Sequence, residues 1–221
     1  IEDNAQAIGA DYIFADGRKQ KVGTIGNIGT TSFFPSKNLG GYGDGGALFT
    51  NDDGIAAKCR VIANHGQSKL YYHDSIGVNS RLDSIQAAIL RIKLKHLDEY
   101  ADARRRVADY YDKAFAGNTK LVTPRRASYS THVFHQYTLQ TKNIDRFEMK
   151  DFLATKNIPA MVYYPVPLHL QKAYSDERYQ KGDFPVTENL CESVISLPVH
   201  TEMDEEMLKY ITSSVLEFAN K

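Results

Sequence analysis

The chain has 221 residues, which is enough for one large domain or two smaller ones. Its 27 basic and 27 acidic residues cancel, so no net field favours nucleic acid or an anionic membrane, and neither is an expected partner. No apolar run is long enough to span a bilayer, and nothing reads as a signal peptide. The two cysteines, Cys59 and Cys191, lie far apart without metal-ligand spacing. We therefore expect a reduced, cytoplasmic protein without a metal site.

The first residues read as the end of a buried strand followed by a turn. Ile1 is not an initiator methionine, and the chain begins with one apolar residue followed by two acidic residues, a pattern typical of the end of a strand. We therefore expect a preceding segment, with this chain as the C-terminal part of a larger protein. Asp3 is expected at the carboxyl end of the strand, where open α/β sheets place their ligands, although an isolated Asp caps a turn at least as often. Residues 15–30 are rich in glycine and threonine, which predicts a hairpin or a long loop.

Residues 51–116 carry two helical patterns separated by a polar segment. The first helix is expected to begin at the cap formed by residues 51–53 and to run to Ala63. Its apolar residues recur at helical spacing and predict a buried stripe: Ile55, Cys59 and Ile62. Residues 65–77 show no clear period and are predicted to form a loop. A long helix is expected from about Ser80 to Ala116, and a helix of that length often connects two domains.

Strand and helix patterns mix in the second half of the chain. Strands are predicted at residues 131–139, 160–164 and 194–197. Helices are predicted at residues 145–156, begun by a capping box, and at the C-terminus, where Thr201 or Asp204 is the cap and the apolar stripe is Met207, Tyr210, Ile211, Val215 and Phe218. These patterns predict a small α+β or α/β domain.

The most informative stretch is residues 31–46, where Lys37 lies between an aromatic-Pro-Ser run and a glycine-rich loop. A solvated lysine in a surface turn is the plainest interpretation. Residues 41–46 also fit the nucleotide fingerprint G-x-G-x-x-G, but that fingerprint needs a helix after it, and here a strand is predicted at 47–50. The third interpretation is a lysine that binds pyridoxal 5′-phosphate (PLP) through its amine. It requires an acidic partner for the pyridine nitrogen and a phosphate anchor nearby.

Four motifs follow one another along the chain: Glu2-Asp3-x-Ala5-Gln6-Ala7-x-Gly9-Ala10, Ser32-Phe33-Phe34-Pro35-Ser36-Lys37-Asn38-x-Gly40, Gly45-Gly46-Ala47 and Gly77-x-Asn79-Ser80-Arg81-Leu82-Asp83-x-x-Gln86-Ala87-Ala88. Together they resemble the DegT/DnrJ family of PLP-dependent nucleotide-sugar aminotransferases. A later motif, Tyr163-Tyr164-Pro165-x-Pro167-Leu168-His169-x-Gln171, resembles the C-terminal domain of the same family. The resemblance implies an α/β, fold type I PLP-transferase. Residues 1–100 would form part of the large PLP-binding domain with a mostly parallel sheet, and residues 101–221 the small C-terminal α/β domain.

The resemblance also implies the residues that hold the cofactor. Lys37 would bind PLP through its amine and, once freed by substrate, carry a proton between the substrate carbon and the cofactor. Asp3 would pair with the pyridine nitrogen and keep it protonated. Gln6 would hydrogen-bond the ring oxygen, and Ser32 the phosphate.

Other residues would serve a neighbouring subunit, since the family forms homodimers. Asn79 would reach the partner's phosphate group and Arg81 a substrate carboxylate, which a planar guanidinium suits. Tyr163 and Tyr164 would approach the partner's substrate pocket. From the sequence alone, a helix N-cap at Asn79 with an ion pair between Arg81 and Asp83 is the alternative.

The implied reaction transfers an amino group from glutamate, leaving 2-oxoglutarate, to a nucleotide-linked keto-sugar for amino-sugar or polysaccharide biosynthesis. Residues 65–81 look most like members that aminate the 3-oxo carbon of uronates derived from UDP-N-acetylglucosamine. The alternative is a catalytically silent binding or regulatory protein that retains the fold. Full members also carry an N-terminal portion with a second phosphate-binding segment and an aromatic ring stacked on the cofactor. We therefore expect the 221-residue chain alone to bind PLP poorly and to be inactive.

Overall fold

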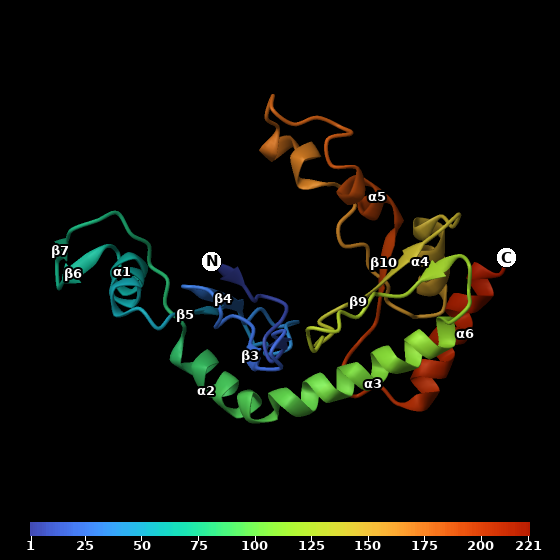
Figure 1. The fold of residues 1–221 in the computed structure, drawn as a ribbon, viewed down its shortest axis with the longest axis horizontal. Helices are drawn as coiled ribbons and strands as arrows, with labels where there is room; N and C mark the ends of the chain where they lie inside the picture. The colour runs from blue at the N-terminus through green and yellow to red at the C-terminus, as the bar shows by residue number, and fades with distance from the viewer. The chain divides into compact units, whose positions relative to one another are not determined.

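The computed structural model describes residues 1–221, and Figure 1 shows the chain as a ribbon. The chain divides into two compact units. Unit 1 comprises residues 1–102 and 126–135, and unit 2 comprises residues 103–125 and 136–221. The long helix α3 begins in unit 1 and ends in unit 2. Secondary structure in both units mixes helices and strands, which confirms the α/β class. The assignment of residues 1–100 and 101–221 to two domains of a PLP enzyme stays a prediction.

Unit 1 contains a three-stranded sheet and two hairpins. The sheet has the order β1-β4-β5, with β1 at Glu2–Asp3, β4 at Gly29–Ser32 and β5 at Gly46–Phe49. Strands β1 and β4 are parallel, and β4 and β5 are antiparallel. The first hairpin pairs β2 at Asp11–Ile13 with β3 at Lys19–Lys21. Its turn and β3 lie within the region 15–30 that was predicted to form a hairpin or loop, whereas β2 precedes that region. The second, β6 at Gln67–Lys69 and β7 at Tyr72–His73, occupies the segment predicted to be a loop.

The first helix of unit 1 follows its local capping signal more closely than its apolar periodicity. Helix α1 spans Asp53–Ala63, and the Asp52 side chain accepts a hydrogen bond from the Ile55 amide, as the cap predicted. Its predicted buried stripe is wrong, because α1 buries no residue completely and Ile62 is 48% exposed. The long helix begins four residues later than expected, at Ser84. It divides into α2 (Ser84–Lys93), a 3₁₀ turn (Leu94–His96) and α3 (Leu97–Phe115).

The core of unit 1 packs loop residues against helices α2 and α3. One cluster of buried side chains joins Phe33, Leu39, Leu90 and Leu97. A second joins Ala10, Ala101 and Val133, so the segment 126–135 is part of this core although 23 residues of unit 2 precede it in the chain. That segment also pairs with the first hairpin, where Asp11 N donates to Thr131 Oγ1 over 2.8 Å.

Unit 2 is a three-stranded antiparallel sheet with helices. The strands have the order β10-β9-β8, with β8 at Leu121–Val122, β9 at Tyr137–Thr141 and β10 at Val194–Leu197. The helices are α4 at Arg146–Thr155, α5 at Pro185–Ser193 and α6 at Glu205–Ala219, with short 3₁₀ turns at Leu168–Leu170 and Lys172–Tyr174. Caps at Asp145 and Asp204 begin α4 and α6.

Three predictions for the second half of the chain are wrong in part. The strand expected from residue 131 begins only at Tyr137, because Phe134 has a φ of +43°, which breaks an extended strand. Residues 160–164 form a single bridge between Met161 and Ser196 instead of a strand. The buried face of α6 is rotated from the predicted stripe. Met207 and Tyr210 are about half exposed, and the buried residues are Leu208, Ile211, Thr212, Ser214, Val215 and Ala219.

No helix of this chain combines the length and the apolar character that a membrane span requires.

Candidate active site

Lys37 lies on a closed backbone loop that follows β4. The Gly41 amide donates to the Phe33 carbonyl over 2.8 Å and closes the loop, while the Lys37 amide donates to the Phe34 carbonyl over 2.8 Å and forms its turn. A Cβ atom on Gly40 would lie 2.2 Å from the Pro35 carbonyl oxygen, so only glycine allows the two limbs of the loop to approach this closely. The backbone around Lys37 is therefore fixed by its own hydrogen bonds.

The Lys37 side chain is half-buried and forms no hydrogen bond or ion pair within the chain. The neighbouring Asn38 is buried at 6% exposure, and its Nδ2 donates to the Val133 carbonyl over 2.8 Å. The other amide atom of Asn38, Oδ1, is buried without a partner. The turn thus presents a free amine while the next residue attaches the turn to the segment 126–135.

Asp3 and Ser32 lie at the same edge of the sheet. Each is the last residue of its strand, the strands are parallel neighbours, and Asp3 pairs with Thr30 in their register. Ser32 is therefore two residues beyond the position opposite Asp3, roughly 7 Å along the strand. Asp3 is exposed, and its Oδ1 accepts a hydrogen bond from the Ala5 amide over 3.0 Å, so the turn-capping interpretation is also correct. Asp3 Oδ2 has no partner within the chain.

Gln6 lies in the turn after β1, and its side chain is exposed. Ser32 Oγ accepts a hydrogen bond from the Phe34 amide over 3.2 Å, which leaves its own hydrogen available for donation. Together with Asp3 and Lys37, these two residues give a set of one carboxylate, one amide, one hydroxyl and one amine, all exposed or half-buried. These donors and acceptors fit the pyridine nitrogen, ring oxygen, phosphate and aldehyde of the expected cofactor.

Glu2, next to Asp3, stabilises the neighbouring loop and is not free for chemistry. Its carboxylate accepts hydrogen bonds from the amides of Gly23, Ile25 and Gly26 at 2.6–2.9 Å. Burial alone would raise the pKa of Glu2, but the amides of Gly26, Gly23 and Ile25 lower it below its ordinary value.

Asn79 and Arg81 form a pair on the segment between β7 and α2. Arg81 Nε donates to Asn79 Oδ1 over 2.9 Å, and both side chains are exposed. The alternative from the sequence is wrong, because the N-cap of α2 is Asp83 and Arg81 bonds Asn79 instead of Asp83. The terminal nitrogens of Arg81 remain available to a planar anion. No hydrogen bond or ion pair joins this pair to Asp3, Ser32 or Lys37.

Tyr163 and Tyr164 belong to unit 2, so the structure does not place them against the residues of unit 1. Tyr163 is half-buried and Tyr164 is 64% exposed, with ring centroids 5.6 Å apart in an edge-on arrangement. The segment that follows them is folded by Glu188 of α5, which accepts hydrogen bonds from the Gly182 amide and lies 3.1 Å from His169 Nε2. The Gly182 amide is the main reason that the pKa of Glu188 lies below its ordinary value.

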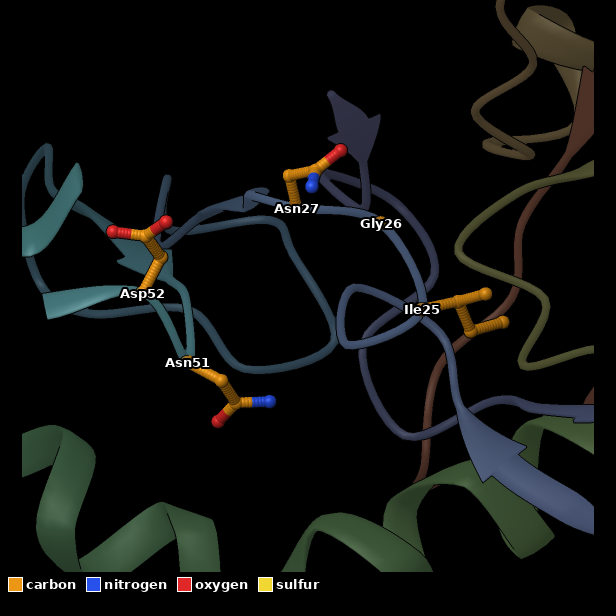
Figure 2. A pocket seen from close by; sticks show the side chains of 5 residues that line it. All are labelled: Ile25, Gly26, Asn27, Asn51 and Asp52. Carbon is orange, nitrogen blue, oxygen red and sulfur yellow. The ribbon is translucent and has the colours of Figure 1, made fainter. Parts of the chain in front are cut away.

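One hollow in unit 1 lies away from these residues. It has a volume of about 440 Å³ and is lined by Ile25, Gly26, Asn27, Asn51 and Asp52. Because these residues precede β4 and follow β5, they lie at the opposite end of the strands from Ser32. Figure 2 shows that the Ile25 side chain points away from Asn51 and Asp52, and Asp52 already caps α1. This hollow therefore lacks the convergent polar groups of a binding site.

Three residues that touch the Lys37 loop were given no role from the sequence: Asn38, Gln86 and Lys93. Asn38 bonds Val133, while Gln86 and Lys93 of α2 bond the Tyr42 amide and the Gly40 carbonyl. All three partners are backbone atoms, which leave no trace in a residue pattern. The one available signal was the glycine run itself, which is required wherever another element packs directly on the backbone.

Comparison with known proteins extends over almost the whole chain. The model of the DegT/DnrJ/EryC1/StrS aminotransferase family matches residues 1–216. A pleiotropic regulatory protein of Geobacillus stearothermophilus is 46% identical over 99% of this chain and 57% of its own length. A UDP-N-acetyl-3-dehydro-alpha-D-glucosamine 3-aminotransferase of Acidithiobacillus ferrooxidans is 43% identical over 97% of this chain and 56% of its own.

A solved structure gives the same result at the level of the fold. The crystal structure of Streptomyces venezuelae DesV, in complex with a ketimine intermediate, superposes with a TM-score of 0.90 at 36% identity. It matches 99% of this chain and 57% of that one. The chain thus spans somewhat more than half the length of the proteins it matches.

Proposed function

Since the chain belongs to the DegT/DnrJ/EryC1/StrS aminotransferase family, we propose that the protein transfers the amino group of glutamate to a nucleotide-linked keto-sugar. The cofactor in this proposal is PLP, and the substrate is a UDP-linked 3-oxo-2-acetamido sugar, the class named for the relative from Acidithiobacillus ferrooxidans. The sequence motifs favour its uronate form. The product is an amino sugar for polysaccharide biosynthesis.

One observation carries the proposal. Lys37 presents a free amine from a fixed turn that directly follows β4, and β4 and its parallel neighbour end in Ser32 and Asp3. A surface lysine in a flexible turn would not need the buried Asn38 bond or the close approach at Gly40. The position of Lys37 after β4, together with Asp3 and Ser32 at the ends of neighbouring strands, supports a PLP site near this edge of the sheet.

Each residue has a role that its chemistry supports. When bound, PLP supplies an electron sink for the negative charge that develops at the substrate carbon. Lys37 Nζ would accept the proton from that carbon and donate it to the cofactor, which requires part of the amine to be unprotonated. Asp3 would hold the proton of the ring nitrogen by charge, Ser32 Oγ would donate to the phosphate, and the Gln6 amide would orient the ring oxygen.

We further propose a homodimer in which Asn79 and Arg81 enter the partner's site, Asn79 at the phosphate and Arg81 at a substrate carboxylate. Three features support it. Both side chains are exposed, and Arg81 keeps its terminal nitrogens free. The turn of the neighbouring hairpin exposes Leu70 and Tyr71 at 68 and 80%, and Ile76 after the hairpin is 99% exposed. Exposed apolar side chains of this kind mark interaction surfaces. Tyr163 and Tyr164 would approach the same substrate pocket.

The two unpaired thiols, Cys59 and Cys191, support the cytoplasmic location that we propose.

The first test measures cofactor attachment. Full-length protein is incubated with PLP, reduced with borohydride and analysed by peptide mass spectrometry. We expect a stable adduct on Lys37 and none in the Lys37→Ala variant. An adduct on another lysine, with Lys37 unmodified, would contradict the proposal. The isolated 221-residue chain, treated in the same way, is expected to give little adduct, because it spans only 57% of the length of its relatives.

The second test measures the substrate. A panel of UDP- and dTDP-linked keto-sugars is incubated with glutamate, and 2-oxoglutarate is measured. We expect the highest kcat/KM for the UDP-linked 3-oxo-2-acetamido sugars, with the uronate above its neutral counterpart, since Arg81 would bind the carboxylate. Equal values for the two would remove the support for the uronate.

A regulatory protein is the second candidate, because the relative from Geobacillus stearothermophilus is named a pleiotropic regulatory protein. A silent protein has no need of the free Lys37 amine. Colour separates the two: full-length protein that is yellow, and loses this colour when glutamate is added, supports transamination. Protein that stays colourless with added PLP supports a regulatory role.

A further inference from the structure

We propose that Gln86 is a positioning residue for Lys37, because it holds the glycine-rich loop that closes the Lys37 turn. The inference rests on the proposed function, in which Lys37 binds the cofactor and moves the proton. Gln86 itself is not expected to touch cofactor or substrate.

Gln86 lies in α2, and its side chain is half-buried against the loop. Its Oε1 accepts a hydrogen bond from the Tyr42 amide over 2.7 Å. A Cβ atom on Gly41 would lie 2.9 Å from this oxygen, and one on Gly43 would lie 3.1 Å from Gln86 Nε2. Glycine on both sides of Tyr42 therefore lets the backbone lie directly on the Gln86 amide. Residues 41–46 fit a phosphate-binding fingerprint, but in this chain helix α2 packs on their backbone.

A short path connects this contact to Lys37. The Gly41 amide, one residue before Tyr42, closes the Lys37 loop by donating to Phe33. Lys93, two helical turns after Gln86 on the same face of α2, donates through Nζ to the Gly40 carbonyl. Helix α2 thus holds residues 40 and 42, on either side of the residue that closes the loop.

The loop has little rigidity of its own. Five of the seven residues 40–46 are glycine, the residue type that loses most conformational freedom on ordering. Without an acceptor at position 86, the Tyr42 amide bonds water, and Gly41 keeps a held neighbour only on the Gly40 side, where Lys93 bonds the carbonyl. The Lys37 amine then samples more positions, and a displacement of about 1 Å is enough to lower a catalytic rate about 100-fold.

The test compares two substitutions in the full-length protein. Gln86→Met keeps the length of the side chain and removes the acceptor, whereas Gln86→Glu keeps an acceptor for the Tyr42 amide. We expect Gln86→Met to lower kcat at least about tenfold, with the KM for glutamate changed less than about twofold. The rate at which added PLP attaches to Lys37, followed by absorbance, is expected to fall in the same variant. Gln86→Glu is expected to stay within about threefold of the wild type in both measurements. Arg91→Met, an exposed change in the same helix, is the control.

A second readout needs no cofactor. Hydrogen exchange of the peptide that covers residues 40–46 is measured by mass spectrometry in PLP-free protein. We expect faster exchange in Gln86→Met than in the wild type, and wild-type exchange in Gln86→Glu and Arg91→Met. This measurement decides the role of Gln86 even where Gln86→Met is too unstable for kinetics.

Two outcomes would overturn the inference. Wild-type exchange and wild-type PLP attachment in Gln86→Met would show that the loop holds its shape without Gln86. Equal losses in Gln86→Met and Gln86→Glu would show a packing role without the accepted hydrogen bond. Failure of the wild-type protein to attach PLP at all would instead disprove the proposed function. The hydrogen-exchange result would still show whether Gln86 orders residues 40–46.

Discussion

At the residue scale, Gly40 is the position at which the Lys37 turn tolerates least change. A Cβ atom there would lie 2.2 Å from the Pro35 carbonyl oxygen, a backbone atom that cannot rotate away. We expect Gly40→Ala to lower the free energy of unfolding by about 1–3 kcal/mol, since the loop must open to admit the methyl group. It is also expected to abolish the borohydride adduct on Lys37.

The matched control for Gly40→Ala is Gly26→Ala. A Cβ atom on Gly26 meets its nearest neighbour at an ordinary 3.5 Å. Urea unfolding should therefore show a change of less than about 1 kcal/mol for the control. Equal stability of the two variants would mean that the Lys37 loop is not closed as described.

Glu2 gives a prediction of pH dependence. Its carboxylate accepts three backbone hydrogen bonds, and its pKa in the folded protein lies below the ordinary value of 4.5. A lowered pKa means that the charged form stabilises the fold above pH 4.5, and that this stabilisation is lost as the pH falls through the lowered pKa. We expect Glu2→Gln to be less stable than the wild type by on the order of 1 kcal/mol at pH 7.

The check is the urea midpoint of both proteins measured from pH 7 down to pH 3. The difference between Glu2→Gln and the wild type is expected to shrink below pH 4.5 and to vanish at the acid end. A constant difference over the whole range would show that the charge of Glu2 contributes nothing.

At the scale of elements, the structure decides between two caps for the terminal helix that the sequence left open. Asp204 Oδ1 accepts a hydrogen bond from the Met207 amide over 2.8 Å, whereas the Thr201 hydroxyl donates to the Glu202 side chain. We expect Asp204→Ala to lower the free energy of unfolding by about 1 kcal/mol, the usual effect of removing an N-cap. Thr201→Ala, measured alongside by urea unfolding, should be nearly neutral. The reverse order would contradict this capping geometry.

The same element shows which parts of the fold are readable from the sequence. Helices α1, α4 and α6 were predicted because Asp52, Asp145 and Asp204 accept hydrogen bonds from amides two or three residues away. The strand expected from residue 131 was wrong because its first residues belong to the core of unit 1. There, Val133 accepts a hydrogen bond from Asn38, a residue 95 positions earlier. Local rules predict caps, and they do not predict partners at such separations.

The candidate site follows the same division. Motif order led to Asp3, Ser32 and Lys37, and the structure shows that the strands ending in Asp3 and Ser32 are parallel neighbours. Periodicity could not show that α2 packs on the glycine run, because Gln86 and Lys93 bond backbone atoms. The one sign in the sequence was that the glycine fingerprint at residues 41–46 is not followed by the helix that a nucleotide-binding site requires. This absence suggested that another element packs on these glycines.

At the scale of the whole molecule, the dimer proposal can be tested by mixing two inactive variants, because recovery of activity then requires residues from two different subunits. Lys37→Ala and Arg81→Ala proteins are each expected to be nearly inactive. If each site combines Lys37 of one subunit with Arg81 of the other, a mixed dimer has one intact site and one doubly defective site.

Random exchange of subunits makes half of the dimers mixed. Mixing equal amounts of the two inactive proteins is therefore expected to restore about one quarter of the wild-type activity, measured as 2-oxoglutarate formed. An Arg81 that acts only on its own subunit's site gives no recovery, because no subunit then carries both intact residues. Lys37→Ala mixed with Lys37→Arg is the control and should stay inactive.

Since Arg81 Nε is held by Asn79 Oδ1 in the free chain, Asn79→Ala is expected to complement Lys37→Ala in the same way as Arg81→Ala does. Recovery with Arg81→Ala and not with Asn79→Ala would assign Asn79 to its own subunit.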